Sequence, residues 1–450
     1  MPRLLFGLLL SLTLSLPGCG KKEAVVPAVT DRSSTPRAAV KLTIMVVDDP
    51  EIAAGIGMLR GEWAERSGGE LIVQQWTSQQ LNGAEELTPD LVIYPSRYLG
   101  ALVDRQWLRP VRKSLSEDGE LNLQDIYPLL RNRVMRFGGE IFGLSLGEPP
   151  LMLAWDGAVP SELGVGRSFS WSQCDRLSAA RPQDSALKSP LAVELIVRAV
   201  GYDDQAGDPA ILFDSQTMEP QLLDPPFVRA FHDLKLLAQK AAQGEGAPTA
   251  SLSWPTASPE TATDGNSEGQ VSVSFFAIPR AEEVYDRSLG GWSLGEESNE
   301  RPVFLGFSGC MVSVSRNSRN AVSAFMLLKW LASGETAIQV TQRSNATIWF
   351  RRSQASQSAM WLGGKNVSGS TSLAVTKLLS STKAFVLPRI PGIDEYLELL
   401  EKAIADAQLG EIEEEDALRQ AVSSWRSLTD RYGKQRQLEA YRRHLGFNEQ

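Results

Sequence analysis

Apolar and polar residues alternate along this chain in two rhythms, and each rhythm predicts a different kind of element. Runs rich in β-branched and other apolar residues predict strands at residues 41–47, 71–76 and 91–94. Apolar residues three or four positions apart predict helices over residues 52–67 and 96–106. Strands that alternate with helices in this way are typical of a layered α/β domain with parallel strand pairing.

The two rhythms continue towards the end of the chain. They predict further strands at residues 141–144, 150–155 and 270–278, and a strand pair or bent strand at residues 301–315. Helical spacing recurs at residues 170–180, 189–200, 226–242, 320–333, 338–343, 395–407 and 415–430. Residues 243–269 are rich in Gly, Ser, Thr, Pro and Ala, which indicates a long surface loop.

The first forty residues differ in composition from the rest. Arg3 gives a positive start, and residues 4–16 form an almost unbroken apolar run that is too short to span a bilayer. Small residues follow at once, so residues 1–18 are predicted to be a signal peptide. Residues 19–40 are largely polar, contain proline and have no period, which indicates a flexible tether.

The residues around the predicted cleavage point resemble the lipobox of bacterial lipoproteins. Leu16, Pro17 and Gly18 precede Cys19, and that resemblance implies that the Cys19 sulfur is diacylated and its new amine acylated. The alternative is an ordinary signal peptide with a chance cysteine. Because several acyl chains anchor a protein durably, we expect an exported chain tethered to the cell envelope, at the inner or the outer membrane.

Composition narrows the classes of function. The chain has 450 residues, 42% hydrophobic and 22% charged, which is ordinary globular composition. A net charge of −9 with dispersed basic residues argues against binding to nucleic acid. No later segment has the long apolar run of a membrane helix.

Histidine and cysteine are scarce, which limits the possible chemistry. A zinc site or a Ser-His-Asp triad would have to use His232 or His444, and neither lies in a supporting motif. We expect both on helix surfaces, and we predict no catalytic residue, no metal and no cofactor. Cys174 and Cys310 could form a disulfide or remain two buried thiols.

Several segments, taken in order, resemble the extracellular solute-binding protein family 1, the maltose-binding-protein-like receptors of ABC transporters. The segments are PDLVIY at residues 89–94, LGALVDRQWLRP at 99–110, FGGEIFGL at 137–144, LMLAWD at 151–156, SWSQ at 170–173, SVSRNSRNAVSAFMLLKWLAS at 313–333 and WRSLT at 425–429. The resemblance as a whole covers about residues 41–433. The sequence departs from the family pattern at Ser145, Ala154 and Trp155, which leaves the ligand preference open.

The resemblance implies a two-lobed, periplasmic-binding-protein-like α/β fold with a ligand cleft at the hinge. Lobe 1 would comprise residues 41–147 plus 310–347, and lobe 2 residues 148–309 plus 348–450. The chain would cross between the lobes near residues 146–150, 309–313 and 345–350. It also implies a monomeric receptor that closes around a small polar solute, an oligosaccharide, and presents it to an ABC permease.

Ligands of layered α/β proteins bind beyond the carboxyl ends of strands, and this rule selects the candidate contacts. They are Asp48, Asp49, Trp76 and Tyr94 at one rim, Glu148 and Trp155 beside the first crossing, and Phe276, Arg280, Phe307 and Ser308 farther on. Indole rings would cover the face of a sugar, while carboxylates and arginine would bind its hydroxyls. Alternatively, the aromatic side chains pack in the core, and Glu148 pairs with Arg280. Trp254, in the predicted loop, is expected to face solvent; the alternative is that it caps the cleft.

Two other functions remain open at this point. The departures from the family pattern and the long polar loop also fit a sensor or surface-interaction lipoprotein that has the same fold and no role in transport. A secreted polysaccharide hydrolase would need two paired carboxylates, and no spacing in the sequence singles out such a pair.

Overall fold

The computed structural model describes residues 40–112, 117–163, 169–178, 190–204, 209–242, 250–256, 273–295, 301–362 and 369–447. The predicted signal peptide, tether and lipidation site at Cys19 lie outside these residues. Most of the loop predicted at residues 243–269 lies outside them too.

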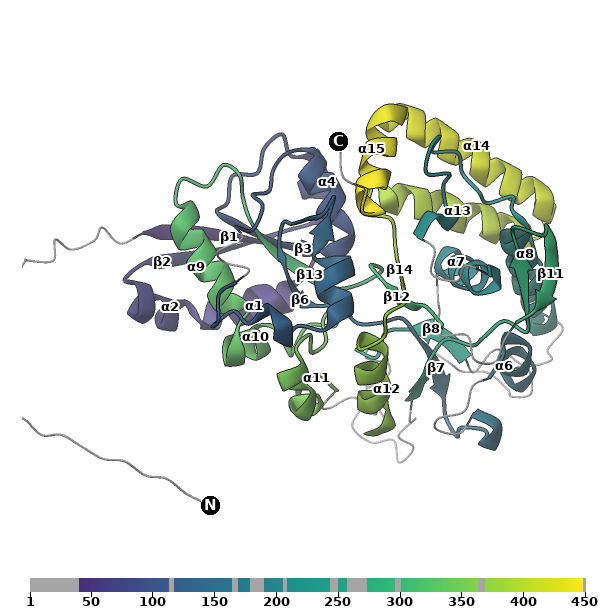
Figure 1. The fold of residues 1–450 in the computed structure, drawn as a ribbon, viewed down its shortest axis with the longest axis horizontal. Coiled ribbons are helices and arrows are strands. Elements are labelled where there is room, and N and C mark those ends of the chain that lie inside the picture. Colours follow the sequence, from purple (N-terminus) through teal and green to yellow (C-terminus); the bar gives the residue numbers. More distant parts are fainter. Residues whose placement is uncertain are drawn as a thin grey trace, which may run out of the picture. The chain divides into compact units, whose positions relative to one another are not determined.

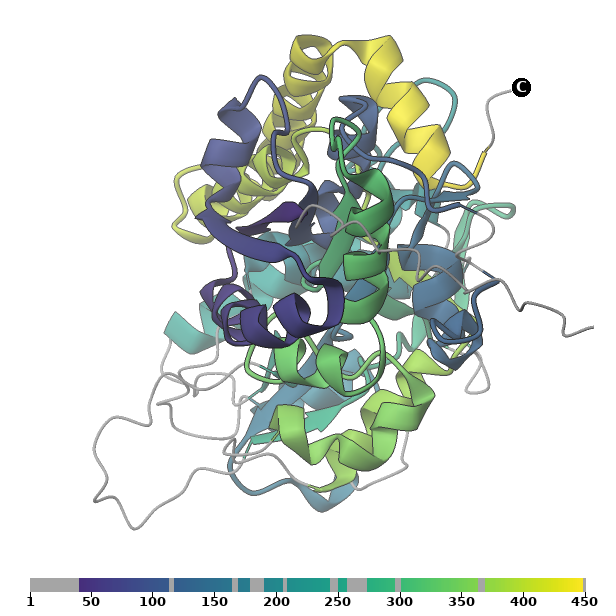
Figure 2. The same cartoon turned by 90° about the vertical axis from the view of Figure 1, so that its left-hand side faces the viewer.

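One five-stranded sheet contains the first three predicted strands. Its order is β2 (Glu70–Trp76), β1 (Lys41–Val47), β3 (Leu91–Pro95), β13 (Cys310–Val314) and β6 (Leu144–Gly147). β1 pairs in parallel with β2 and β3, as predicted, whereas β13 runs antiparallel to both of its neighbours. Figures 1 and 2 show β13 lying beside the N-terminal strands although it is far from them in sequence.

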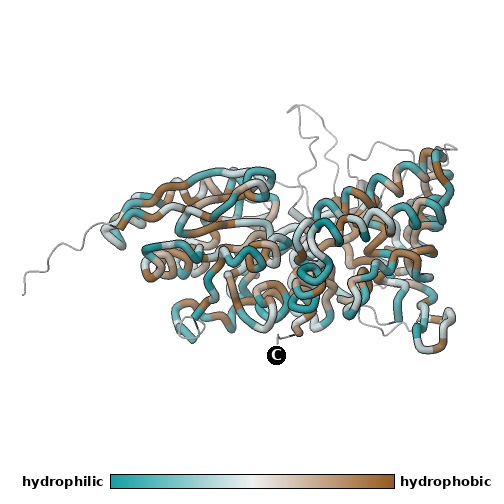
Figure 3. Tube along the Cα trace, turned by 90° about the horizontal axis from the view of Figure 1, so that it is seen from above, coloured by the Kyte–Doolittle hydropathy of each residue, from teal (hydrophilic) through white to brown (hydrophobic). Residues whose placement is uncertain are grey.

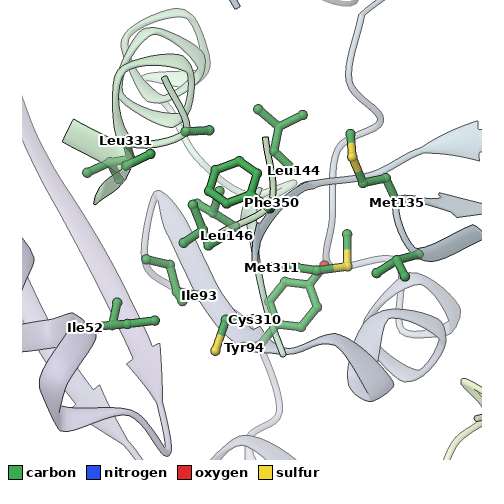
Figure 4. Packing of buried hydrophobic residues seen from close by; sticks show 14 of the residues in the cluster. Ile52, Ile93, Tyr94, Met135, Leu144, Leu146, Cys310, Met311, Leu331 and Phe350 are labelled. Carbon is green, nitrogen blue, oxygen red and sulfur yellow. The ribbon is translucent and has the colours of Figure 1, made fainter. Parts of the chain in front are cut away.

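Buried side chains from distant parts of the chain meet around this sheet (Figure 4). Ile93 and Tyr94 of β3 pack near Met311 of β13, with Leu144 and Phe350 close by. All five side chains are buried. Strands that are covered on both faces read as near-continuous apolar runs, which is the pattern of residues 91–94.

Helices pack against this sheet and against each other. They include α1 (Pro50–Met58), α2 (Arg60–Ser67), α4 (Leu99–Asp104), α9 (Ala321–Leu331) and α10 (Gly334–Thr341). The single helix predicted over residues 52–67 is wrong in one respect, because the chain bends at Leu59 and forms two helices. Asp49 starts α1 by accepting a hydrogen bond of 2.9 Å from the Ile52 amide, ahead of Pro50 at the first turn.

A second group of strands is built on β7 (Met152–Asp156). It pairs antiparallel with β8 (Ala250–Ser253) and β9 (Val273–Phe276). Met152 and Ala154 pack in one hydrophobic cluster, while Leu153 and Trp155 pack in another. Because side chains alternate across a strand, β7 contributes to both clusters.

The parallel pair β12 (Val303–Leu305) and β14 (Ala384–Val386) divides its side chains in the same way. Phe304 and Phe385 lie in the second cluster, and their strand neighbours lie in the first. These short strands therefore have two buried faces.

Amphipathic helices surround the second cluster. They are α6 (Trp171–Ser178), α7 (Leu191–Tyr202), α8 (Pro225–Ala242), α13 (Ile393–Gln408), α14 (Glu414–Tyr432) and α15 (Lys434–His444). Figure 3 shows apolar and polar residues alternating along such helices, so that one face of each can pack inward. Phe213 stacks on Trp425 of α14 with ring centroids 4.9 Å apart, which fixes α14 to this cluster.

Several elements were not predicted. The strand β8 lies inside the segment predicted as a loop, and the hairpin of β10 (Glu283–Asp286) and β11 (Gly291–Leu294), α12 (Gly369–Leu379), β14 and α15 are further additions. The remaining elements are short: α3 (Ser78–Gly83), η1 (Ser96–Tyr98), η2 (Leu123–Asp125), η3 (Leu130–Val134), β4 (Arg136–Phe137), β5 (Glu140–Ile141), η4 (Ser161–Leu163), η5 (Pro209–Ile211), η6 (Arg352–Gln357) and α11 (Ala359–Leu362).

The scarce residues occupy contrasting places. Cys174 and Cys310 are two buried thiols with no disulfide between them, which is the second of the two alternatives. His232 lies on the helix surface, as predicted, beside Glu414. The prediction for His444 is wrong: it is buried, and its Nδ1 accepts a hydrogen bond of 3.2 Å from Arg389. Burial and the nearby positive charge of Arg389 hold the pKa of His444 well below its usual value.

Candidate functional site

A large cavity lies among α6, α7, α8, α13, β7 and β8. Its volume is about 1130 Å³, and we call it the α7–α13 cavity. Figure 1 shows α7, α8 and α13 grouped together, and these three helices contact one another in pairs. Cavities that bind small molecules commonly measure about 300–1,000 Å³, so this one has room for a solute of several rings.

Most of the wall of the α7–α13 cavity is apolar. Trp171, Leu234 and Leu252 contribute buried side chains, and Trp254 contributes a half-buried indole. Trp254 therefore does not project into solvent as the sequence predicted, because β8 holds its segment against the second cluster. Aromatic side chains in such a wall can cover the apolar face of a sugar ring.

One face of α13 supplies much of the polar part of the wall. The lining residues from this helix are Asp394, Leu397, Glu398, Glu401, Lys402, Ala405 and Gln408. They recur every three or four positions, so they share one stripe of the helix. The sequence showed this helix as strongly amphipathic, but a single sequence does not tell whether a polar stripe faces a cavity or bulk solvent.

Arg97 approaches the cavity from the end of β3. Its Nε lies 2.7 Å from Oδ1 of Asp394, at the start of α13, and the Tyr98 hydroxyl donates a hydrogen bond to the same carboxylate. An ion pair thus joins the segment that follows β3 to the helix that lines the cavity. Neither Arg97 nor Asp394 was predicted as a site residue.

A cluster of charged side chains lies in the wall around Arg198 of α7. Asp175 accepts two hydrogen bonds from its guanidinium, of 2.8 and 3.0 Å, and Glu194 accepts a third of 3.3 Å. The guanidinium also lies 4.0 Å from the centre of the Trp171 ring. Burial raises the pKa of Glu194; Arg198 acts to lower it, whereas Asp175 and Glu401 raise it further.

The structure places three of the predicted ligand contacts in the core. The side chains of Tyr94, Glu148 and Trp155 are all 0% exposed. The Tyr94 hydroxyl lies 2.8 Å from the Ser313 hydroxyl, and the Trp155 indole donates to the Ala158 carbonyl at 3.2 Å. Both aromatic rings therefore pack in the core, which is the alternative stated above, because neither ring is accessible from outside.

Glu148 has partners other than the one expected. Its carboxylate accepts a hydrogen bond of 2.7 Å from the Gly306 amide, and the cations that act on its pKa are Arg389 and Arg97. Burial nevertheless raises the pKa of Glu148 to about 8. Arg280 instead lines a separate cavity of about 70 Å³, so a pair between Glu148 and Arg280 is not formed.

Asp48, Asp49 and Trp76 lie together at the carboxyl ends of β1 and β2, as the rule for α/β proteins predicts. Asp48 accepts a hydrogen bond of 2.8 Å from the Ser78 amide. Asp49 accepts hydrogen bonds from the Ile52 amide and from the Ser344 hydroxyl, at 2.9 and 2.5 Å. Trp76 is half-buried against the first cluster. None of the three lines the α7–α13 cavity.

The remaining predicted contacts, Phe276, Phe307 and Ser308, differ in whether they line the cavity. Phe307 lines the α7–α13 cavity, alone among the ten predicted ligand contacts. Phe276 packs edge-to-face on Phe169 with ring centroids 6.0 Å apart, and the Ser308 carbonyl accepts a hydrogen bond of 3.3 Å from Ser96. The rule that ligands bind beyond strand ends thus selected Phe307 at the edge of the cavity, but it selected none of the lining residues on the helices.

Solved structures of solute-binding proteins have a similar fold. An ABC transporter solute-binding protein from Agrobacterium radiobacter, in complex with ribitol, is 17% identical with a TM-score of 0.61; the match covers 86% of this chain and 98% of that one. A cyclo/maltodextrin-binding protein with maltotetraose is 16% identical with a TM-score of 0.60, covering 86% and 97%. The sugar-binding protein MalE from Xanthomonas citri is 13% identical with a TM-score of 0.62, covering 87% and 98%.

Sequence comparison adds nothing to these matches. No protein-family model matches the chain, and no curated protein matches it significantly. At such low identities the likeness is one of fold, and it confirms the predicted periplasmic-binding-protein-like class. Within the described ranges, no helix has both the length and the apolar character needed to cross a membrane.

Proposed function

We propose that the chain is an extracytoplasmic receptor that binds a small polar solute, a saccharide or polyol, and delivers it to an ABC importer. The observation that carries the proposal is the α7–α13 cavity of about 1130 Å³, in a fold shared with proteins solved with ribitol and maltotetraose. A wall that combines indole rings with carboxylates suits a ligand with apolar ring faces and a rim of hydroxyls.

The proposed motion is closure of two lobes around the solute, with the lobe boundaries predicted from the sequence. The second hydrophobic cluster supports part of this division, because all of its buried residues belong to predicted lobe 2. The strands β7, β12 and β14 join it to the first cluster, so any bending has to occur around these shared strands. Arg97 and Asp394 are the proposed contact between the lobes, since the first follows β3 and the second begins α13.

The N-terminal segment supports a place outside the cytoplasm. Residues 1–18 have the charge and apolar run of a signal peptide, and Cys19 stands where a lipoprotein is acylated. A lipid anchor would hold the receptor at the membrane that contains its permease.

Calorimetric titration of the purified chain with ribitol, maltotriose, maltotetraose and glucosamine oligomers tests the proposal. A solute that binds only the folded protein, at a hundredfold its Kd, stabilises it by about 2.7 kcal/mol, so thermal unfolding provides a second readout. We expect Trp254→Ala to weaken binding at least tenfold. Trp292→Ala, at a half-exposed indole on β11 outside the cavity, is the matched control.

Three results would contradict the proposal. One is that no solute binds a chain that unfolds cooperatively. Another is that both tryptophan variants weaken binding equally, which would place the solute elsewhere. The third is release of shorter saccharides from a bound oligomer, which would favour a hydrolase.

A further inference from the structure

The α7–α13 cavity contains more negative than positive side chains. Asp175, Glu194, Asp394, Glu398 and Glu401 line it, against Arg97, Arg198 and Lys402. Each of these cations has a carboxylate partner in the protein: Asp394 for Arg97, Asp175 for Arg198 and Asp406 for Lys402. The hydroxyl groups of a neutral saccharide can bind carboxylates, but they can also bind amides and other neutral groups, so they do not by themselves require an excess of negative charge.

Two of the carboxylates keep an oxygen available. Glu194 accepts from Arg198 through Oε1, and Glu401 accepts from the Ala192 amide through Oε2 at 2.7 Å. Among the described residues, no hydrogen bond or ion pair engages Oε2 of Glu194 or Oε1 of Glu401. Both residues are half-buried, and the negative charge of Glu401 contributes to raising the pKa of Glu194.

Donors without partners lie in the same wall. Among the described residues, Nε1 of Trp171, Nε of Arg198 and Nε1 of Trp254 have no hydrogen-bond partner, although all three atoms are buried. Trp171 and Arg198 are only 3% and 2% exposed. Buried donors left without acceptors are costly, but none of these three atoms is open to the cavity, so they mark a tightly packed part of its wall.

We infer that the cavity selects saccharides that carry a protonated amine, with Glu194 and Glu401 receiving the ammonium group and the Trp171 and Trp254 rings packing on the apolar face of the sugar. This inference rests on the proposed function and narrows its solute class. An ammonium group placed between the two carboxylates forms charge-assisted hydrogen bonds and removes their mutual repulsion. The apolar wall then covers the sugar ring, so that a single solute contacts both the carboxylates and the aromatic side chains of the cavity.

Two β-1,4-linked trimers that differ only in the amine provide the test. Chitotriose, the fully deacetylated glucosamine trimer, and cellotriose, its glucose counterpart, are titrated into the purified chain at pH 6 and at two salt concentrations. We expect chitotriose to bind at least about tenfold more tightly, the equivalent of one charge-assisted hydrogen bond. Its affinity should fall with added salt, whereas that of cellotriose should not.

Single substitutions test whether Glu194 and Glu401 are responsible for the preference for the amine. Glu401→Gln and Glu194→Gln each keep one acceptor oxygen and remove the charge, so each should weaken chitotriose binding about tenfold and change cellotriose binding less than twofold. Glu65→Gln, at an exposed position on α2 outside the cavity, should change neither. Circular dichroism and thermal unfolding of each variant show that the fold is kept.

The possible failures are distinct. If cellotriose binds as tightly as chitotriose, or if Glu401→Gln and Glu194→Gln leave chitotriose binding unchanged, the inference is overturned and the receptor function stands. If neither trimer nor any other saccharide or polyol binds the folded chain, both are overturned.

Discussion

Gly309 lies directly against the carboxyl group of Glu148. A Cβ atom at Gly309 would overlap both oxygens of that carboxyl group, and the backbone φ of Gly309 is +105°. Glu148 follows β6 and Gly309 precedes β13, so the contact joins two of the segments predicted to cross between the lobes. The absence of a side chain at position 309 therefore permits a buried carboxyl group at this crossing.

Gly309→Ala should destabilise the fold by about 2–4 kcal/mol, because it combines a steric overlap with an unfavourable backbone conformation. Chemical denaturation measures the change. Gly57→Ala is the control, since a Cβ there meets no atom within 4 Å and the residue lies inside α1. That change should stabilise the protein by about 0.5–1 kcal/mol. Equal effects of the two variants would mean that the contact with Glu148 has no structural role.

Glu148 should make the stability of the fold depend on pH. Burial raises its pKa from 4.5 to about 8, so between these values the folded chain holds a proton that the unfolded chain has released. Its contribution to the free energy of unfolding therefore falls as pH rises through this window, by up to about 1.4 kcal/mol per pH unit.

Glu148→Gln isolates this effect. The amide oxygen can still accept from the Gly306 amide, and no charge forms at high pH. We expect the variant to match the parent chain near pH 4.5 and to exceed it in stability at pH 8, as measured by urea denaturation at several pH values. Parallel stability curves for the two chains across this range would show that Glu148 is not the responsible group.

The sequence allowed the sheet and the main helices to be predicted because their apolar periods are strong. Residues 41–47 and 91–94 became β1 and β3 with the expected parallel pairing. The short strand β14 was missed because three residues, Ala384–Val386, are too few to show a period. The strand β8 was missed because its residues, Ala250–Ser253, are mostly small and polar, and they are ordered by pairing with β7.

The candidate site was less accessible to sequence reasoning. Trp155 and Tyr94 have the right side chains for a sugar and lie near the right strand ends, but they face the core. On a strand, a shift of one position exchanges the two faces, and only the packed structure settles which face is covered. The lining residues of α7 and α13 come together through tertiary packing, for which local sequence contains no signal.

Cys19 is predicted to determine where the chain is found. If Cys19 is lipidated, the protein expressed in a bacterial host should be found in the membrane fraction. Cys19→Ser should prevent acylation, so that the protein is either released into the soluble fraction or keeps its uncleaved signal peptide and migrates as a larger chain. Fractionation and immunoblotting measure the distribution, and labelling with radioactive palmitate measures the acylation directly. Cys174→Ser, at a buried thiol, is the control for loss of a cysteine elsewhere. A parent chain that carries no label would refute the anchor.

The ion pair between Arg97 and Asp394 should favour the closed arrangement of the proposed lobes. Its side chains are 22% and 34% exposed, so water weakens the attraction only in part, and Tyr98 adds a hydrogen bond to the same carboxylate. Asp394→Asn removes the charge at nearly constant shape. We expect it to weaken solute binding about fivefold, which corresponds to about 1 kcal/mol.

Small-angle scattering of the solute-free chain distinguishes an effect on closure from an effect on solute contact. Asp394→Asn should increase the radius of gyration without solute, and saturating solute should reverse the increase, because the solute binds the closed arrangement more tightly than the open one. Glu415→Gln breaks an exposed ion pair with Arg419 within α14 and should change neither quantity. If Asp394→Asn weakens binding while the scattering curve stays that of the parent chain, Asp394 acts on the solute directly rather than on closure.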